Sequence, residues 1–383
     1  MPVASPEIPR ARPAPDPRPG PSTRPLRIVR YYPRAIVGDG GITRSVWHHS
    51  LELAGEGAEI VIAYADGSPP ATPAGVRLVP VRHAGRPWPV PLGLEEVLEG
   101  ADVLVLHSAW ALHNVRAAAV ARRMGVPYLL EPRGAYDPCI VGRKRWRKLA
   151  WWLVMERRLV HGARGIHVFF ESERPHLDAL GYRGGIVVAP NGVEIHDEFR
   201  WDGGSGGYVL WYGRFDPEHK GIDLLLGAIH RLDPAERPPV RLHGPDSRAG
   251  GKARIRALVA DLELEPWVTV GEPVHGDEKY GLLARAAGFA YPSRWEGFGN
   301  AAAEAASVGV PLLVTPYPLG HYLAERGAAV LAAADPDALA DGMRRLLAPE
   351  ARGIGDRAAR LVRDEFTWSQ VARSWLAQVR SLL

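Results

Sequence analysis

The stretch that decides the fold is SRWEGFGNAAAEAASVGVPLL, residues Ser293–Leu313. It places two carboxylates, Glu296 and Glu304, eight positions apart around a glycine turn and an alanine run. Because Gly297 and Gly299 have no Cβ, the backbone of the turn can approach a ligand closely and point N–H groups at it. The alanine helix that follows presents its positive N-terminal end to the same spot. The segment therefore predicts a ligand-binding turn between a strand and a helix of an α/β fold.

The composition is that of an ordinary globular protein. The chain has 383 residues, of which 46% are hydrophobic and 23% charged, and this length predicts two domains or one large one. The sequence lacks an apolar run of about eighteen residues, and its first residues do not show the pattern of a signal peptide. The single cysteine, Cys139, excludes an internal disulfide and is typical of a reducing compartment. We therefore expect a cytoplasmic protein.

The chain divides into five predicted segments. Residues 1–25 hold nine prolines and four arginines, and they are predicted to be a disordered leader. Short apolar strands alternate with helical stretches through residues 26–194, and the alternation restarts in residues 208–365. Segment 195–207 is the predicted linker, and residues 366–383 are predicted to form a helix that packs back toward the N-terminal domain. The pattern predicts an α/β fold of two Rossmann-like, doubly wound domains facing across a cleft.

Polar and glycine-rich stretches follow the strands of the second half, at the sheet edge where such folds bind ligands. GRFDPEHKG places Arg214 and Lys220 directly after a strand, and two cations there suit a phosphate. The alternative for this loop alone is a solvated basic surface. LHGPDSRAGG and VGEPVHGDEKYGLL put Gly244 and Val274 in two further loops, which can hold a nucleobase through backbone groups.

The two carboxylates are predicted to bind hydroxyl groups. Glu296 precedes the turn and can face the cleft, whereas Glu304 lies about one turn into the helix, among alanines that leave room for a ligand. A carboxylate at the second position can accept hydrogen bonds from two ribose hydroxyls. The alternative is that Glu296 caps the helix and Glu304 is solvated. Together with the cations and the helix end, the pair predicts a site for a nucleoside diphosphate attached to a hydroxyl-rich group.

The first half offers a matching surface. GDGGI places Gly40 and Gly41 after the first strand and before a helix, which allows close approach to a diphosphate from the opposite side of the cleft. The segment lacks the G-x-G-x-x-G dinucleotide pattern, so hydride transfer is not indicated. LHSAW and EPRGAYDP place His107, Glu131 and Arg133 at the ends of two further strands. A lone histidine is usually structural, but this position makes His107 a candidate site residue.

Six segments of the chain, taken in order, resemble the retaining glycosyltransferases of the GT-B fold, family-4 type. They are GDGGI, LHSAW, PRGAYDPC, APNGV, GRFDPEHKG and YPSRWEGFGNAAAEAASVGVP. The resemblance covers the chain from Leu26 to its C-terminus, and the spacing of Glu296 and Glu304 is its most specific element. It is strongest to bacterial enzymes of polysaccharide and natural-product (antibiotic) assembly. One departure is GAEI at Gly57–Ile60, where the family often has Gly-His-Glu-Val; this difference affects packing, not chemistry.

The resemblance implies roles for the matched residues. Arg214 and Lys220 would neutralise the donor diphosphate, Glu304 would bind ribose, and His107 would lie beside the transferred sugar. The predicted catalytic residues are His107, Arg214, Lys220 and Glu296. The predicted donor-binding residues are Gly40, Gly41, Arg214, Lys220, Gly244, Val274, Glu296, Gly297, Phe298, Gly299, Asn300 and Glu304. Arg133 and Trp110 are predicted to contact the acceptor.

The implied reaction moves a sugar from a nucleoside-diphosphate sugar, with UDP favoured and GDP an alternative, to a hydroxyl of a glycan, lipid-linked glycan or natural product. Fixed cations and a helix end can stabilise the leaving diphosphate, so no metal or other cofactor is expected. The only Asp-x-Asp element, Asp335–Asp337, precedes a helix and is interpreted as a cap. A same-fold sugar-phosphate phosphorylase or synthase remains an alternative.

A basic segment suggests a different class of function. Arg143–Trp152 carries five cations and three tryptophans at the start of a predicted helix, Arg143–His161. Such a segment can contact an anionic membrane, which would make the protein peripheral at the inner face. The alternative is an amphipathic helix with its aromatic side chains toward the core. A non-enzymatic nucleic-acid binder would also be basic, but the chain carries no recognised nucleic-acid-binding module, and no nucleic-acid partner is expected.

Overall fold

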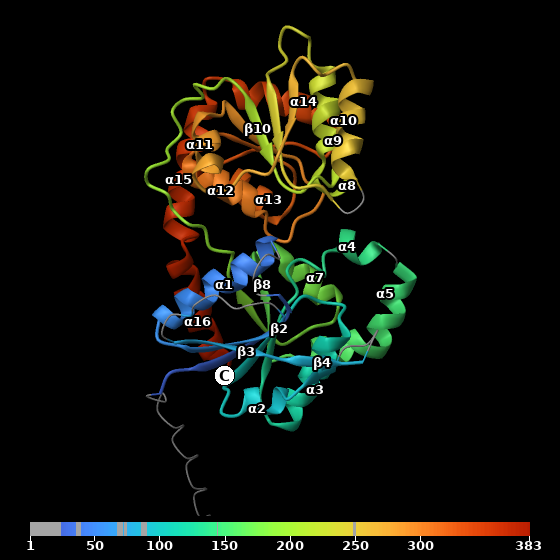
Figure 1. Ribbon diagram of the computed structural model, residues 1–383, viewed down its shortest axis with the longest axis vertical. Helices are drawn as coiled ribbons and strands as arrows, with labels where there is room; N and C mark the ends of the chain where they lie inside the picture. The colour runs from blue at the N-terminus through green and yellow to red at the C-terminus, as the bar shows by residue number, and fades with distance from the viewer. Residues whose placement is uncertain are drawn as a thin grey trace, which may run out of the picture.

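The protein consists of two α/β bodies stacked along the long axis of the molecule (Figure 1). The computed structural model describes residues 24–35, 40–66, 72, 75–85, 90–143, 145–247 and 250–383. The predicted leader, residues 1–25, lies outside the described residues except for Arg24 and Pro25. The expected α/β class with two Rossmann-like domains is confirmed, because each body is built on one parallel sheet.

The first sheet has seven parallel strands in the order β3-β2-β1-β6-β7-β8-β9. Its strands are β1 Arg27–Ala35, β2 Glu59–Asp66, β3 Val76–Pro80, β6 Val103–His107, β7 Tyr128–Glu131, β8 Gly165–Val168 and β9 Gly185–Val188. In β1, Ile28 pairs with Ile60 of β2 on one side and with Val103 of β6 on the other. A small antiparallel hairpin, β4 Arg82–Ala84 and β5 Val90–Leu92, stands beside this sheet.

Helices cover both faces of the first sheet, which is why most of the side chains of its strands are apolar. One face packs against α2 Leu94–Leu98, α3 Leu112–Arg123, α6 Arg157–His161 and α7 Arg174–Ala179. The other packs against α1 Gly40–Gly55 and α16 Trp368–Leu382. The C-terminal helix therefore belongs to the core of the N-terminal body, and Figure 1 shows the red end of the chain crossing from one body to the other.

The second sheet has six parallel strands in the order β12-β11-β10-β13-β14-β15. Its strands are β10 Val209–Tyr212, β11 Val240–His243, β12 Val268–Gly271, β13 Gly288–Tyr291, β14 Leu312–Val314 and β15 Val330–Leu331. Its helices are α8 Pro217–Lys220, α9 Ile222–Arg231, α10 Gly251–Asp261, α11 Gly276–Arg285, α12 Asn300–Val308, α13 Pro318–Glu325, α14 Pro336–Leu347 and α15 Ala351–Glu365. These elements bury one continuous apolar core, which includes the fully buried Trp211 and Phe289.

The predicted helix Arg143–His161 is confirmed from Arg145 onward, with a π-helical turn inside it. After α4 Pro138–Gly142, the described chain forms α5 Arg145–Trp151, a π-helical turn η1 Trp152–Glu156, and then α6. The extra residue of the π-turn points Glu156 into the protein, where the carboxylate is fully buried. A short 3₁₀ turn, η2 Glu171–Glu173, follows β8.

The order of the strands fixes where a ligand can bind. Strand order reverses between β1 and β6 in the first sheet, and between β10 and β13 in the second. In doubly wound sheets the crevice outside the carboxyl ends of such strands is the binding site. The loops after β10 and β13 begin at Gly213 and Pro292, so they bring the GRFDPEHKG and SRWEGFGN segments to the same edge.

Candidate active site

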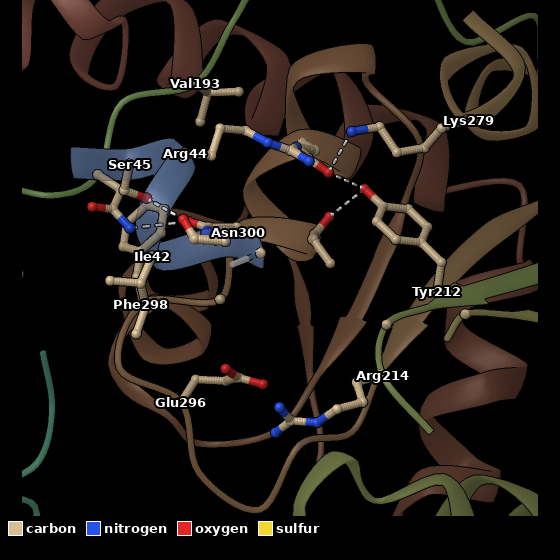
Figure 2. Close-up of a pocket in the computed structure, with 18 of the residues that line it drawn as sticks. Ile42, Arg44, Ser45, Val193, Tyr212, Arg214, Lys279, Glu296, Phe298 and Asn300 are labelled. Carbon is tan, nitrogen blue, oxygen red and sulfur yellow. Dashed lines mark hydrogen bonds and ion pairs between the residues drawn. The ribbon is translucent and has the colours of Figure 1, made fainter. Parts of the chain in front are cut away.

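A cavity of about 970 Å³ lies between the two bodies (Figure 2). It is lined from the first body by the start of α1 and the loop after β7, and from the second by the loops after β10, β11, β12 and β13. Every residue predicted for donor binding lies in its wall: Gly40, Gly41, Arg214, Lys220, Gly244, Val274, Glu296, Gly297, Phe298, Gly299, Asn300 and Glu304. Arg133 also lines it, but His107 and Trp110 do not.

Glu296 is held by a cation and a hydroxyl. Its Oε1 accepts hydrogen bonds from Lys220 Nζ at 2.5 Å and from Ser293 Oγ at 2.6 Å. Lys220 Nζ also donates to the hydroxyl of Tyr291 at 2.9 Å. Burial alone would raise the pKa of Glu296, but the charges of Lys220 and His219 and these hydrogen bonds lower it below its usual value. The carboxylate is therefore ionised and oriented before any ligand arrives.

The position of Lys220 depends on the glycine that follows it. Gly221 has a φ of +63° and ends α8, and a Cβ there would lie 1.9 Å from the carbonyl oxygen of Pro292. Only glycine allows the Lys220 loop to pack this closely against the end of β13. The close packing is what brings the cation to Glu296.

Glu304 is bound by a second cation and a buried phenol. Its Oε2 lies 2.9 Å from Lys279 Nζ and accepts a hydrogen bond from the Tyr212 hydroxyl at 2.8 Å. Burial, together with the charge of Glu304, raises the pKa of Tyr212 well above its usual value, so the hydroxyl stays a donor. The other oxygen, Oε1, is 3.4 Å from Arg44 Nη1 of the opposite body. The carboxylate thus has one oxygen fixed by its own body and one toward the cavity.

Arg214 and two helix ends supply the remaining positive character. The side chain of Arg214 is about half exposed, and in Figure 2 it points toward Glu296 across the cavity. α12 begins at Asn300 after Gly299, whose φ of +102° turns the chain into the helix. A Cβ on Gly41, at the start of α1, would be 3.2 Å from Asn300 Nδ2, so the N-terminal ends of α1 and α12 meet here. The first N–H groups of a helix lack intrahelical partners and favour anions.

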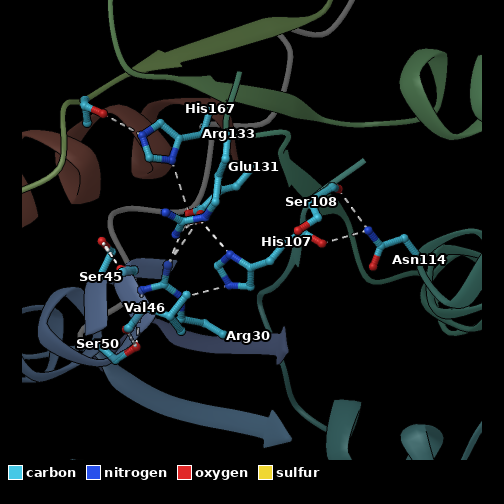
Figure 3. Close-up of polar contacts among 12 residues, drawn as sticks. Arg30, Ser45, Val46, Ser50, His107, Ser108, Asn114, Glu131, Arg133 and His167 are labelled. Carbon is cyan, nitrogen blue, oxygen red and sulfur yellow. Dashed lines mark hydrogen bonds and ion pairs between the residues drawn. The ribbon is translucent and has the colours of Figure 1, made fainter. Parts of the chain in front are cut away.

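The structure corrects the predicted place of His107. Its ring is fully buried beneath the cavity wall, where Nδ1 lies 2.8 Å from Glu131 Oε2 and Nε2 accepts a hydrogen bond from Arg30 Nε at 3.3 Å (Figure 3). Burial lowers the pKa of His107 to about 4, so the imidazole is neutral. A ring in this position does not touch a sugar in the cavity. The burial of His107 was not predicted from the sequence, because nothing in the sequence indicated that Arg30 of β1 is buried beside it.

Glu131 connects this buried cluster to the cavity. Its carboxylate lies 3.2 Å from Arg30 Nη2, 3.2 Å from His167 Nδ1 and 3.1 Å from Arg133 Nη2. Burial by itself would raise the pKa of Glu131, but His107 and Arg30 hold that pKa well below its usual range. Arg133, at a φ of +54°, reaches from this anchor into the cavity wall. Of the two residues predicted for the acceptor, Arg133 is therefore at the cavity.

Trp110, the other predicted acceptor residue, lies away from the cavity. Its backbone N–H donates to Glu156 Oε1 at 3.0 Å, and its indole Nε1 donates to the carbonyl of Ala135 at 3.0 Å. The tryptophan thus ties the loop after β7 to the π-turn, and it supports the loop that carries Arg133. The prediction that Trp110 contacts an acceptor does not fit this position.

Several cavity residues were not foreseen. The main ones are Arg44, His48, Asn191, His196, Tyr212, His219, Lys279, Tyr280 and Tyr291. Lys279 and Asn191 lie in the quoted segments VHGDEKYGLL and APNGV. Their position after a strand could therefore have indicated that they line the site. Arg44 and Tyr212 carried no such signal.

The predicted capping role of Asp335 is confirmed, since its carboxylate accepts a hydrogen bond from the Ala338 N–H at 2.9 Å. In the described ranges, no group of three or more His, Cys, Asp or Glu side chains could hold a metal ion. Metal independence nevertheless stays a prediction. No helix within the described part of the chain is long and apolar enough to cross a bilayer.

Comparison with known proteins identifies the family. Residues 40–192 match the model of the glycosyl transferase 4-like domain, and residues 206–349 match that of the glycosyl transferases group 1. The chain is 30% identical over 319 residues to D-inositol 3-phosphate glycosyltransferase of Frankia alni, covering 73% of this chain and 74% of that protein. It is 28% identical over 203 residues to MMP alpha-(1->4)-mannosyltransferase of Mycolicibacterium hassiacum, covering 50% and 47%.

Solved structures agree on the fold. Sucrose-phosphate synthase of Thermosynechococcus elongatus superposes with a TM-score of 0.73 at 19% identity, covering 93% of this chain and 99% of that one. Anabaena HepE in complex with UDP gives a TM-score of 0.74 at 15% identity, covering 94% and 100%. The family models and the relatives define a sugar-transferring enzyme, and the solved structures give its GT-B architecture. The chain belongs to the glycosyltransferases of the family-4 type, and the alternative of a non-enzymatic basic binding protein is not favoured.

Proposed function

We propose that this glycosyltransferase moves a sugar from a nucleoside-diphosphate sugar to a hydroxyl of a glycan or natural product, with retention of configuration and without a metal ion. One observation carries the proposal: a single cavity holds both carboxylates, Glu296 and Glu304, together with Arg214, Lys220 and the N-terminus of α12. UDP is the favoured nucleotide, because a structure of similar fold, HepE, is described in complex with UDP and with UDP-glucose. Since the single cysteine allows no internal disulfide, we also propose a cytoplasmic location.

The donor diphosphate would lie between Arg214, Lys220 and the ends of α1 and α12. Cleavage of the sugar–phosphate bond leaves negative charge on the diphosphate, and these fixed donors would stabilise that charge without reorganising. Lys220 Nζ lies 2.5 Å from Glu296 Oε1 and neutralises its charge. Its Nζ has three hydrogens, so it can bind phosphate oxygen while keeping its contact with Glu296.

The two carboxylates would divide the hydroxyls of the donor between them. Glu304 has Oε2 occupied by Lys279 and Tyr212, which orients Oε1 for a ribose hydroxyl. Displacement of Arg44 from Oε1 would accompany this binding. Glu296 would accept hydrogen bonds from hydroxyls of the transferred sugar through Oε2, because Oε1 is occupied by Lys220 and Ser293.

Retention would proceed on the face of the sugar from which the diphosphate leaves. A double-displacement reaction needs a free carboxylate as nucleophile. Glu296 is a poor one, because short hydrogen bonds from Lys220 and Ser293 stabilise its charge and lower its pKa. The leaving phosphate itself would then accept the proton of the acceptor hydroxyl as the new glycosidic bond forms.

A thermal-shift panel of UDP, GDP, ADP and TDP tests the donor site. We expect one nucleotide to raise the Tm of the wild type and to lose most of that effect in Glu304→Ala. Asp197→Ala, which removes a surface carboxylate paired with Arg363, is the matched control and should keep the full shift. An equal shift in the Glu304 variant would remove Glu304 from the ribose site.

Two further measurements address metal and stereochemistry. Transfer assayed in excess EDTA should proceed at the rate measured without EDTA. The anomeric configuration of the product, read by NMR, should equal that of the donor. Activity that disappears on chelation and returns with manganese would refute metal independence, and an inverted product would refute retention.

A further inference from the structure

An apolar patch is exposed on the outer side of α5 and η1. Trp146 is 83% exposed, Leu149 47%, Leu153 62% and Val154 61%. These four residues, called here the α5 patch, are half of the eight large apolar side chains exposed on the described residues. Figure 1 shows α5 at the outer edge of the N-terminal body. Single exposed apolar side chains are ordinary, but a group of this kind marks an interaction surface.

Contacts on the opposite face of the helix hold the α5 patch toward solvent. Residues three, seven and eight positions apart share one face of a helix, so Trp146 aligns with the other three members. On the opposite face, the buried Glu156 accepts hydrogen bonds from the Tyr136 hydroxyl and from Trp151 Nε1, both at 2.8 Å. Rotating the helix to bury the patch would break these contacts. The alternative that the aromatic side chains face the core holds for Trp152, which packs against the core of the N-terminal body, but not for the exposed Trp146.

The surroundings of the α5 patch are cationic. Exposed arginines flank it on both sides in the chain: Arg143, Arg145, Arg147, Arg157 and Arg158. Between Arg143 and Phe170 the only acidic residue is Glu156, and its carboxylate is fully buried. The segment thus exposes apolar side chains next to positively charged arginine side chains.

The chain that leads into α5 contacts the other body beside the active-site cleft. The guanidinium of Arg143 lies 4.6 Å above the ring of Trp295, in the other body. Trp295 directly precedes Glu296 in the chain, and its ring stacks on His219 at 4.4 Å. A surface bound to α5 would therefore lie next to the rim of the cleft, on the side of the N-terminal body.

We propose that the α5 patch docks the protein on an anionic lipid bilayer, and that the acceptor is carried by a lipid in that bilayer. An exposed tryptophan with leucine and valine suits the interface between headgroups and acyl chains, and the arginines suit anionic headgroups. A nucleic acid would match the arginines but not the aliphatic side chains. The statement about the acceptor rests on the proposed function, whereas the docking itself does not.

Co-sedimentation with vesicles tests the docking. We expect the protein to bind vesicles of phosphatidylcholine and phosphatidylglycerol, and to bind phosphatidylcholine alone at least about tenfold more weakly. Leu153→Glu and Trp146→Ser should each weaken binding to the anionic vesicles by about tenfold. Leu347→Glu, at an exposed leucine on α14, is the control and should change it less than about twofold. Because all three side chains are exposed, the fold should be retained, and an unchanged Tm checks this.

Other outcomes overturn the proposal. Equal binding of wild type and patch variants, or stronger binding to a DNA duplex than to the anionic vesicles, would refute membrane docking. The nucleotide-dependent thermal shift should persist in Leu153→Glu, since that residue does not line the donor cavity. Loss of vesicle binding with an intact shift is the expected pattern. A wild type that shows no shift but still binds vesicles would refute the donor site and leave the docking standing.

The acceptor itself is tested by transfer. With a membrane extract as acceptor, Leu153→Glu should incorporate radiolabelled sugar into the lipid phase at least about fivefold more slowly than Leu347→Glu. Incorporation only into water-soluble material would overturn the assignment of a lipid-linked acceptor.

Discussion

Lys220 Nζ lies 2.5 Å from Glu296 Oε1, which joins a cation from the end of α8 to a carboxylate from the loop after β13. The two side chains neutralise each other at the point where the strand order of the second sheet reverses. A site with a bare carboxylate would repel a diphosphate, and a site with a bare ammonium would bind it without selecting for a sugar. The pair lets one cavity hold an anion and a hydroxyl-rich group side by side.

Replacing Lys220 with methionine should move the pH dependence of transfer. Without the cation, the burial of Glu296 is no longer offset, so its pKa rises and the carboxylate protonates at higher pH. The acid limb of the kcat/KM profile should shift upward, and transfer at neutral pH should fall by about 10²-fold or more. Lys252→Met removes a similar contact, with the exposed Glu272, and should leave the limb in place. An acid limb that does not move in the Lys220 variant would contradict this role.

Glu304→Gln should destabilise the fold because it leaves the buried Lys279 without its anionic partner. Removing one member of a buried pair costs more than removing both, so we expect a loss of about 1–3 kcal/mol in the free energy of unfolding. The double variant Glu304→Gln/Lys279→Met should be more stable than the sum of the two single losses predicts. Urea denaturation in a double-mutant cycle measures this coupling, and strictly additive losses would refute it.

Local sequence was sufficient for much of the fold and for the two carboxylates. Apolar strands alternating with helices predicted both parallel sheets, and the segment around Gly297 predicted a turn at a strand end. Glu296 and Glu304 come to one cavity because a strand, a turn and a helix are consecutive in the chain. Contacts of this kind are set by short-range geometry, which the order of residues shows directly.

The partners of these groups come from distant elements, and this is where sequence reasoning failed. Lys279 meets Glu304 only because α11 packs beside α12. His107 ends a strand, as predicted, but Arg30 and Glu131 on the two neighbouring strands enclose it from both sides. Whether a polar side chain at a strand end faces the cleft or the interior depends on these long-range neighbours.

Gly297→Ala should prevent the two bodies from approaching as closely as they do here. A Cβ on Gly297 would lie 2.6 Å from the carbonyl oxygen of Arg133, and one on Gly134 would lie 2.7 Å from the Cα of Gly297. Both contacts are with backbone, which cannot rotate away. We expect transfer to fall by about tenfold or more, since small displacements of reacting groups cost about this much. Gly55→Ala has open space around its Cβ and should be neutral. Wild-type activity in the Gly297 variant would show that this closeness is not required.

His107 should make the fold sensitive to acid above the range in which carboxylates titrate. Its native pKa is about 4, against an ordinary value of 6.5, so the unfolded chain binds a proton between these values that the native protein does not. The contribution of His107 to the free energy of unfolding is therefore fully present above pH 6.5. It falls as the pH is lowered, by about 3 kcal/mol at pH 4. His107→Asn should lower the stability at neutral pH but flatten its decline between pH 6.5 and 5, measured by urea denaturation. His321→Asn, at an exposed position, should leave the slope unchanged. If the His107 variant declined as steeply as the wild type, another group would have to carry this acid sensitivity.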